Sequence, residues 1–169
     1  MRTLTIKSGG GGGNFTDGWN TAEISNAKYG EWEGNKYLDI FFKDFPETLN
    51  MRVYSKKGKT GEEFAIGRVF RFANAGLTES LEGDDGTKVV KIDDSPEQLT
   101  GKNLNVFLFK DGEYFRILSQ PAPTEFSNVV ESFKDNDVSY WKGKAEKYYN
   151  TYIKKDNTDS DDPFGGMPN

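Results

Sequence analysis

Apolar and polar residues alternate in several short stretches of the chain, which is the pattern of strands with one buried face. The first stretch runs from Trp19 to about Tyr29, the second covers 36–43 and the third covers 48–54. In the second and third stretches, we expect these side chains to face inward: Leu38, Ile40, Phe42, Leu49, Met51 and Val53. Phe45-Pro46-Glu47 is a turn signal between the two, which predicts an antiparallel hairpin.

Helical spacing replaces this alternation in the middle of the chain. Thr60 and Glu63 fit a capping box, and Gly76 is placed to end the helix. Between them, apolar residues recur three or four positions apart: Ile66, Val69, Phe70, Ala73 and Leu77. The polar segment 78–96 then contains one short apolar stretch, Val89–Ile92, which predicts a short strand.

Two further strands are expected near Asp111-Gly112, at 103–110 and 114–118, with Leu104, Val106 and Leu108 facing inward. Three strands, a helix and two strands follow one another in the five-stranded Greek-key barrel of the oligonucleotide/oligosaccharide-binding (OB) type. We therefore expect an all-β fold, an OB barrel with its helix between strands three and four. The expected divisions are a glycine-rich segment 1–17, the barrel 18–123, a helical extension 124–155 and an acidic disordered tail 156–169.

The helical extension carries an aromatic stripe. Asp137 or Ser139 is placed to cap a helix that runs to about Lys155. Its apolar positions are Trp141, Ala145, Tyr148, Tyr149 and Tyr152. This stripe favours a docking face, and a stacking platform for bases is the alternative.

The chain contains no cysteine and no histidine, and this excludes whole classes of site. Disulfides, Cys/His zinc sites, thiol nucleophiles and Ser-His or Cys-His catalytic pairs are all ruled out. Carboxylate–metal chemistry remains, and its candidates are Asp84, Asp85, Asp93 and Asp94. These acids stand in turn-like, glycine-bearing sequence, which favours solvated turns. We expect no enzyme activity, no cofactor and no metal.

Charge is segregated along the chain. The net charge is -5, from 22 basic and 27 acidic residues. Residues 52–71 hold six bases and two acids, 140–155 hold five lysines and one acid, and 156–169 hold four acids and no base. Because a polyanion meets the local field and not the net charge, two basic regions suit a nucleic-acid partner. No stretch approaches the roughly 18 apolar residues of a membrane span, and no signal peptide opens the chain.

Aromatic and basic side chains share the outward face of the predicted hairpin. Single-stranded nucleic acid requires cations along its backbone and flat rings for its unpaired bases. The candidates on the hairpin are Tyr37, Phe41, Lys43, Arg52 and Tyr54. Trp32 stands in a predicted loop at 30–35, and Lys56, Lys57 and Lys59 follow the third strand. We expect these nine residues to bind single-stranded DNA.

Ordinary packing is the alternative for each group. Phe41 can lie under Gly9–Gly13, the basic loop can be merely solvated, and Phe107 and Phe109 are better explained as covered side chains. Arg68 and Arg71 share one helix face, which favours an exposed polar surface.

Two parts of the chain resemble known proteins. Residues 18–120 are similar to the OB-fold single-stranded DNA-binding proteins of bacteriophages, notably in GWNTAEISNAKYGEWEGNKYLDI, EEFAIGRVFRFANAGL and QLTGKNLNVFLFKDGEYFRI. The tail resembles the acidic tip of bacterial single-stranded DNA-binding proteins in these residues: Asp159, Asp161, Asp162, Pro163 and Phe164. In the bacterial family the phenylalanine comes last, whereas here five residues follow Phe164, so it presents no terminal carboxylate.

The resemblance implies a function. It implies a protein that coats single-stranded DNA without strong sequence preference during phage replication and recombination, in the cytoplasm of the infected bacterial host. The tail is expected to recruit replication proteins such as polymerase or helicase-primase, or to compete for the DNA groove. A homodimer is one of the arrangements that related proteins adopt. The alternative is an OB-fold module of a phage that binds proteins and not DNA.

Overall fold

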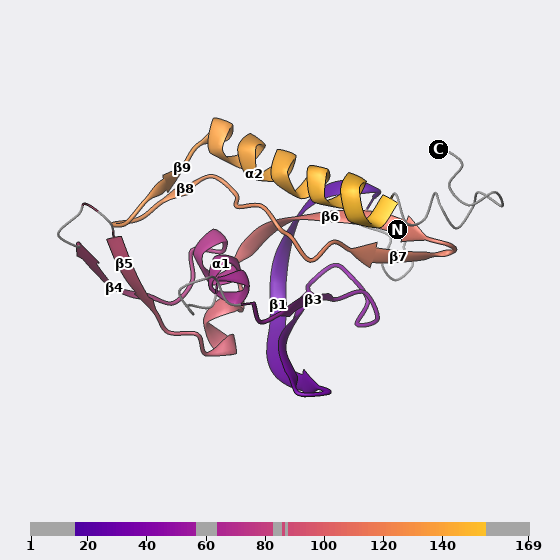
Figure 1. Ribbon diagram of the computed structural model, residues 1–169, viewed down its shortest axis with the longest axis horizontal. Helices are drawn as coiled ribbons and strands as arrows, with labels where there is room; N and C mark the ends of the chain where they lie inside the picture. The colour runs from indigo at the N-terminus through magenta and orange to yellow at the C-terminus, as the bar shows by residue number, and fades with distance from the viewer. Residues whose placement is uncertain (1–15, 57–63, 83–85, 87, 155–169) are drawn as a thin grey trace, which may run out of the picture.

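A curved antiparallel sheet of five strands forms the body of the protein (Figure 1). The computed structural model describes residues 16–56, 64–82, 86 and 88–154. The strands are β1 (Gly18–Trp32), β2 (Asn35–Phe42), β3 (Met51–Tyr54), β6 (Asn103–Asp111) and β7 (Tyr114–Ile117). Their order across the sheet is β3-β2-β1-β6-β7. The mostly β character expected from the alternating pattern is confirmed.

Strand β1 belongs to both halves of this sheet. Its first six residues pair with β6, and its second part pairs with β2. The register shifts between Ile24 and Asn26, where one extra residue of β1 lets the strand bend. The bend turns the two halves toward each other, so their inner faces enclose the core, whose strand residues include Ile24, Leu38, Ile40, Met51, Val53, Leu104, Val106 and Leu108.

The β1–β2 turn is tighter than the expected loop at 30–35. Trp32 pairs with Asn35, so only Glu33 and Gly34 form the turn. Both have positive φ, 51° and 80°, which is the geometry of a type I′ turn and matches the twist of a hairpin. The loop expectation was wrong, and Trp32 ends a strand.

Helix α1 (Ala65–Phe72) is shorter than its pattern predicts. It buries Ile66, Val69, Phe70 and Phe72 against the sheet. Asn74 adopts a left-handed φ of 56°, which ends the helix two residues before Gly76. Leu77 instead begins β4 (Leu77–Glu82), which pairs with β5 (Lys88–Ile92). The short strand at Val89–Ile92 is thus confirmed, β4 was missed, and Thr60 and Glu63 lie outside the described residues.

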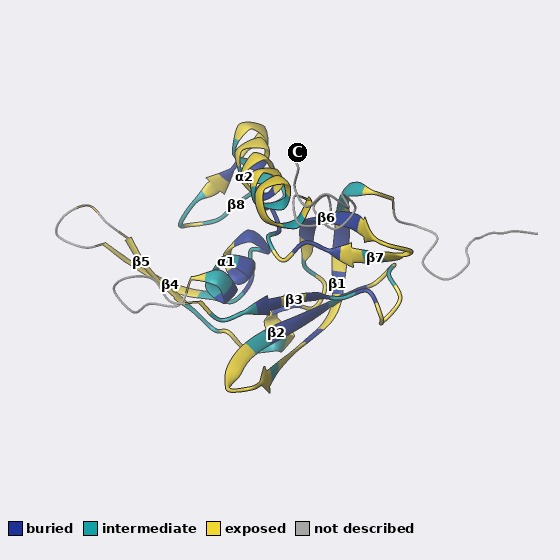
Figure 2. Ribbon diagram, turned by 45° about the vertical axis from the view of Figure 1, so that its right-hand side comes forward, coloured by how far each residue is buried: buried dark blue, intermediate teal, exposed yellow. Residues whose placement is uncertain are grey.

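The described residues do not form a closed barrel. No ladder joins the edge strands β3 and β7 within the described ranges. Helix α1 packs against the inner side, and the β4–β5 hairpin extends away from the body (Figure 1). Buried residues gather on the inner faces of the strands and on the side of α1 that faces them (Figure 2).

The C-terminal part packs on the outer face of β6. After the short helix η1 (Pro96–Leu99), β6 and β7, the chain forms β8 (Phe126–Ser127), β9 (Ser132–Phe133), α2 (Asp135–Tyr148) and the π-helical turn η2 (Tyr149–Ile153). The rings of Phe107 and Phe109 each lie 5.1 Å from the ring of Tyr149, between centroids. The aromatic stripe is therefore a docking face, and both phenylalanines are covered, as predicted.

Helix α2 begins earlier than expected. Its first residue is Asp135, and the side chain of Asp137 accepts a hydrogen bond from the backbone N–H of Lys134 at 2.9 Å. Asp137 therefore caps the helix from its third position and not from before its start. In the described parts of the chain, no helix is both long and apolar enough to cross a membrane.

Replacing Gly143 by alanine is expected to raise the free energy of unfolding by about 0.5–1 kcal/mol. Gly143 lies in the middle of α2, and a methyl group there would meet no atom within 4 Å. Alanine lowers the entropy of the unfolded chain at no steric cost. Urea unfolding measures the change. Gly76→Ala is the opposite control, because its methyl would clash with the backbone oxygen of Asp93 and its φ is +73°; a stabilised Gly76→Ala would contradict this reasoning.

Candidate nucleic-acid interface

The outward face of β2 and β3 brings four of the predicted residues together. Leu38 and Ile40 point into the core, so Tyr37 and Phe41 stand on the opposite face of β2. On β3, Arg52 and Tyr54 face outward in the same way. The register sets Tyr37 directly opposite Tyr54, and their rings meet edge to face with centroids 5.6 Å apart.

Arg52 is held flat at the centre of this face. Its Nε and one terminal nitrogen donate to the two carboxylate oxygens of Asp39, at 2.7 and 2.9 Å. The same guanidinium lies 3.7 Å from the centroid of the Tyr37 ring. The hydrogen bonds that Arg52 donates to Asp39 raise the pKa of Arg52 above its ordinary value. Arg52 therefore offers a flat plane on which a base can stack, while Asp39 neutralises most of its charge.

Asp39 also belongs to this site, although the sequence pattern did not single it out as a binding residue. It is buried, with 5% of its surface exposed, although it stands at an outward position between Tyr37 and Phe41. Its place in the alternation was the signal that could have found it. A carboxylate between two aromatic outward positions, opposite an arginine, is a cross-strand ion pair.

Gly30 explains how Tyr37 lies. The two residues are cross-strand partners on β1 and β2. A methyl group on Gly30 would come within 2.6 Å of three atoms of the Tyr37 side chain. Tyr37 therefore lies across β1, in space that only glycine leaves open, and the guanidinium of Arg52 stacks over its ring.

Cations stand beside the rings of this face. Lys28 of β1 places its Nζ 5.4 Å from the centroid of the Phe41 ring, and Phe41 itself is half-buried. Lys43 is exposed and lies 4.0 Å from Glu23, a long and solvated ion pair. Whether Gly9–Gly13 covers Phe41 concerns residues outside the described ones.

Trp32 occupies the tip of the β1–β2 hairpin. Its side chain is 58% exposed, which is unusual for an indole. Lys56 follows β3 at the same end of the strands, where Ser55 donates to the Lys36 carbonyl, and is exposed too. Lys57 and Lys59, and the tail residues Asp159, Asp161, Asp162, Pro163 and Phe164, lie outside the described residues.

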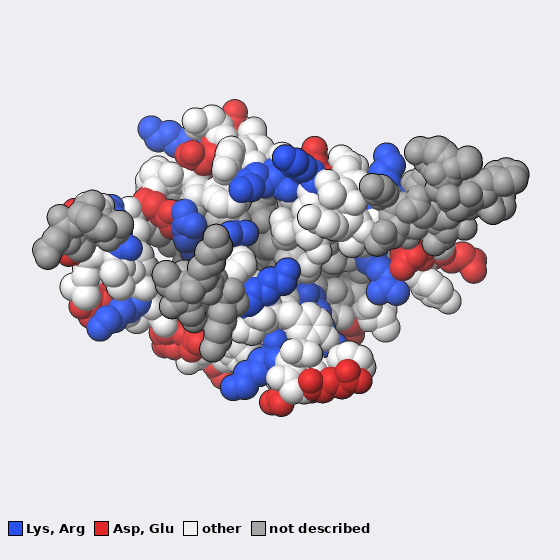
Figure 3. Space-filling view, in the orientation of Figure 1, with Lys and Arg blue, Asp and Glu red and all other residues white. Residues whose placement is uncertain are grey.

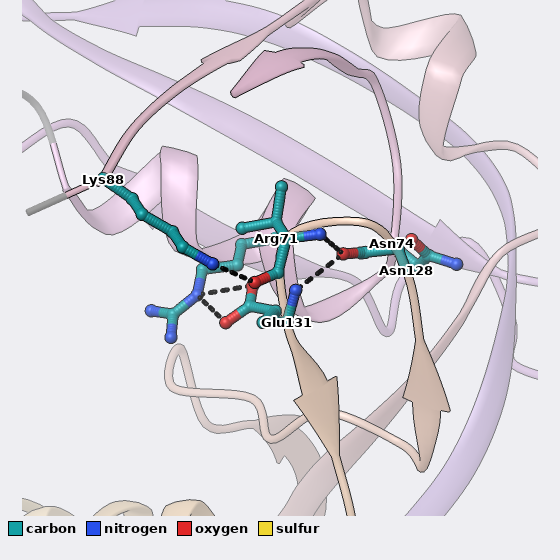
Figure 4. A network of polar contacts seen from close by, with 6 residues as sticks. Arg71, Asn74, Lys88, Asn128 and Glu131 are labelled. Atoms are coloured by element: carbon teal, nitrogen blue, oxygen red, sulfur yellow. Dashed lines mark hydrogen bonds and ion pairs between the residues drawn. The ribbon is translucent and has the colours of Figure 1, made fainter. Parts of the chain in front are cut away.

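Arg71 is exposed, as expected, and it is also part of an ion pair. Its Nε donates to both carboxylate oxygens of Glu131, at 3.0 and 2.9 Å (Figure 4). Nearby, Lys88 donates to the carbonyl of Val130, and Asn128 donates to the side chain of Asn74. This network ties α1 and β5 to the β8–β9 loop.

The acidic residues considered as metal ligands are not grouped around a metal site in the described residues. The carboxylate of Asp93 accepts hydrogen bonds from the backbone and hydroxyl of Ser95 and from Gln98, which lowers its pKa below the ordinary value. Asp84 and Asp85 lie outside the described residues. In the described ranges, no three acidic side chains are grouped to hold a metal ion.

Comparisons of the chain with models of protein families, with curated proteins and with solved structures found no match. The assignment of a function therefore rests on the geometry of the outward face of β1, β2 and β3.

Proposed function

We propose that this chain is a phage single-stranded DNA-binding protein that coats the exposed strand without strong sequence preference during replication and recombination. The observation that supports this proposal most directly is the outward face of β1–β3, where aromatic rings and basic side chains lie side by side. We refer to it as the ring face, and its members are Lys28, Trp32, Tyr37, Phe41, Lys43, Arg52 and Tyr54.

The strand order supports an OB-type arrangement. In an OB barrel, the first strand pairs with both the second and the fourth, and a helix comes between the third and fourth. Here β1 pairs with β2 and β6, and α1 follows β3. The protein then corresponds to such a barrel opened between its third and fifth strands, with the β4–β5 hairpin inserted after the helix.

The ring face can hold a strand by two kinds of contact. Bases stack on aromatic rings and on the plane of Arg52, and each stacked base contributes about 1–3 kcal/mol. Lysines beside the rings neutralise phosphates and release condensed counterions. Neither contact reads the edge of a base, which explains binding that tolerates any sequence.

A salt titration tests this function. We expect a fluorescently labelled oligothymidine to bind with an affinity that falls steeply as salt rises, by a log–log slope of about -0.7 for each neutralised phosphate. Duplex DNA of equal length is the matched control and should bind more weakly, because its bases are already stacked. Affinity independent of salt, or equal binding of the duplex, would contradict the proposal.

The acidic tail extends the proposal to partners. Its four carboxylates and Phe164 suit a basic patch with an apolar pocket on a replication protein such as a polymerase or helicase-primase. A homodimer and a place in the cytoplasm of an infected bacterium belong to the same proposal.

One observation favours the second candidate, a module that binds proteins. The β4–β5 hairpin and the β8–β9 loop expose apolar side chains: Leu81 at 45%, Val89 at 53% and Val129 at 89%. Exposed apolar groups that lie together mark protein contacts. Failure of the full chain to retain labelled oligonucleotide at low salt would favour this candidate over DNA binding.

A further inference from the structure

Within the described residues, Arg68 has no acidic partner, whereas its neighbour Arg71 has one. Both stand on helix α1, three residues apart. Glu131 neutralises Arg71, whereas none of the ion pairs found in the described parts of the chain includes Arg68. Arg68 is also half-buried, so water screens its charge less than that of a surface arginine.

Aromatic rings and further cations surround Arg68. Its guanidinium carbon lies 5.6 Å from the ring centroid of Phe64 and 5.2 Å from that of Trp141. Arg71 and Lys144 approach the same Trp141 ring, at 6.0 and 5.8 Å. Three cations thus share one ring, and a carboxylate neutralises only Arg71 in the described residues.

In the part of the chain that the structure describes, the surroundings leave the charge of Arg68 uncompensated. Burial and, next, the like charge of Arg71 lower the pKa of the Arg68 guanidinium below its ordinary value. Arg52 shows the contrast, since its carboxylate partner raises its pKa. A half-buried cation whose neighbours repel it is a place where an anion gains attraction.

A narrow cleft gives an anion access to Arg68. The cleft measures about 70 Å³ and lies between β3, α1, α2 and the segment after β7. Its walls include Tyr54, Phe64, Gln120 and Tyr148. Since about 10–15 Å³ of such space already admits one water molecule, the cleft has room for a phosphate group.

The cleft continues the ring face. Tyr54 stands beside Tyr37 on the ring face and also lines the cleft. Lysine and arginine side chains gather across the middle of the molecule, from helix α2 down to the strands below it (Figure 3). A strand that leaves the ring face over β3 therefore reaches Arg68 next.

We propose that Arg68 binds a backbone phosphate of single-stranded nucleic acid in the cleft between β3, α1 and α2. The planar guanidinium can donate two parallel hydrogen bonds to phosphate oxygens. Phe64 and Trp141 hold that plane in place before the ligand arrives. This inference rests on the proposed function and adds a contact beyond the ring face.

The test compares salt titrations of the full chain with those of Arg68→Gln, using labelled oligothymidine. We expect Arg68→Gln to bind about tenfold more weakly at low salt, with a log–log slope less steep by about 0.7, the share of one phosphate. Arg116→Gln is the matched control, because Arg116 is an exposed arginine already paired with Asp111. Its slope should equal that of the unmodified chain.

Two further measurements separate phosphate binding from a structural role. Urea unfolding of Arg68→Gln should show undiminished stability, whereas a merely structural arginine would lower stability and leave the slope unchanged. Arg68→Lys should keep the slope and lose affinity, because it keeps the charge without the planar fork. If Arg68→Gln does not fold, the Nε–Hε resonance of Arg68 in the unmodified chain must still shift when oligothymidine is added.

The outcomes distinguish this inference from the proposed function. An unmodified chain that fails to bind oligothymidine at low salt overturns both. An unmodified chain that binds, together with an Arg68→Gln variant of equal affinity and slope, overturns the role of Arg68 alone and leaves the ring face in place.

Discussion

Replacing Phe72 by alanine is expected to lower the free energy of unfolding by about 3–5 kcal/mol. Phe72 ends helix α1 and is completely buried. Its ring lies 5.0 Å from that of Trp141 on α2 and 5.7 Å from that of Phe133 on β9, between centroids. One side chain therefore joins the core of the sheet to the C-terminal extension, and its loss leaves a cavity where three elements meet.

Urea unfolding followed by circular dichroism measures this loss. Val129→Ala is the control, because Val129 is 89% exposed and should change stability by less than about 0.5 kcal/mol. Equal stability of Phe72→Ala and the unmodified chain would mean that the extension does not pack on α1 as described.

Removing two rings from the ring face is expected to have the largest effect on binding. We expect the double variant Trp32→Ala/Phe41→Ala to bind oligothymidine at least about 30-fold more weakly, since each ring that stacks a base contributes about 1–3 kcal/mol. Trp32 is mostly exposed and Phe41 is half-buried, so neither belongs to the fully buried core. The loss should persist at high salt, where the contribution of phosphate contacts fades.

Tyr114→Ala serves as the matched control for this variant. Tyr114 is 75% exposed and stands on β7, which pairs with β6 on the other half of the sheet. Its removal should leave the affinity unchanged. Similar losses from Tyr114→Ala and from the double variant would place the strand elsewhere or show that exposed rings act without a defined site.

The alternation of apolar and polar residues predicted the strands of the sheet. The end of helix α1 depends on local backbone geometry, which the pattern does not show. The inward set Leu38, Ile40, Met51 and Val53 is buried as expected, because a period of two leaves each side chain only one face. The end of α1 was not visible in the pattern. Leu77 continues the helical spacing, yet the left-handed φ of Asn74 redirects the chain into β4.

The sequence predicted where the candidate site lies, but it did not predict which side chains contact one another there. Alternation puts Tyr37, Arg52 and Tyr54 outward, and the structure places them so. The pairing of Arg52 with Asp39 depends on the register between β2 and β3, which the sequence does not state. The partner of Arg71 lies 60 residues away, so no local pattern could reveal that a carboxylate neutralises Arg71.

The sharing of β1 between two halves of the sheet has a consequence for how the chain matures on the ribosome. The pairs of β1 with β2, and of β2 with β3, join neighbouring segments, so this half can assemble soon after Tyr54 is made. The first six residues of β1 must wait for β6, whose Leu108 pairs with Gly18. At roughly 5–20 residues per second, that wait lasts several seconds. The nascent protein can thus form its ring face before β6 and β7 have been synthesised. During that time, the edge of β1 that later pairs with β6 is open to chaperones or to a neighbouring nascent chain.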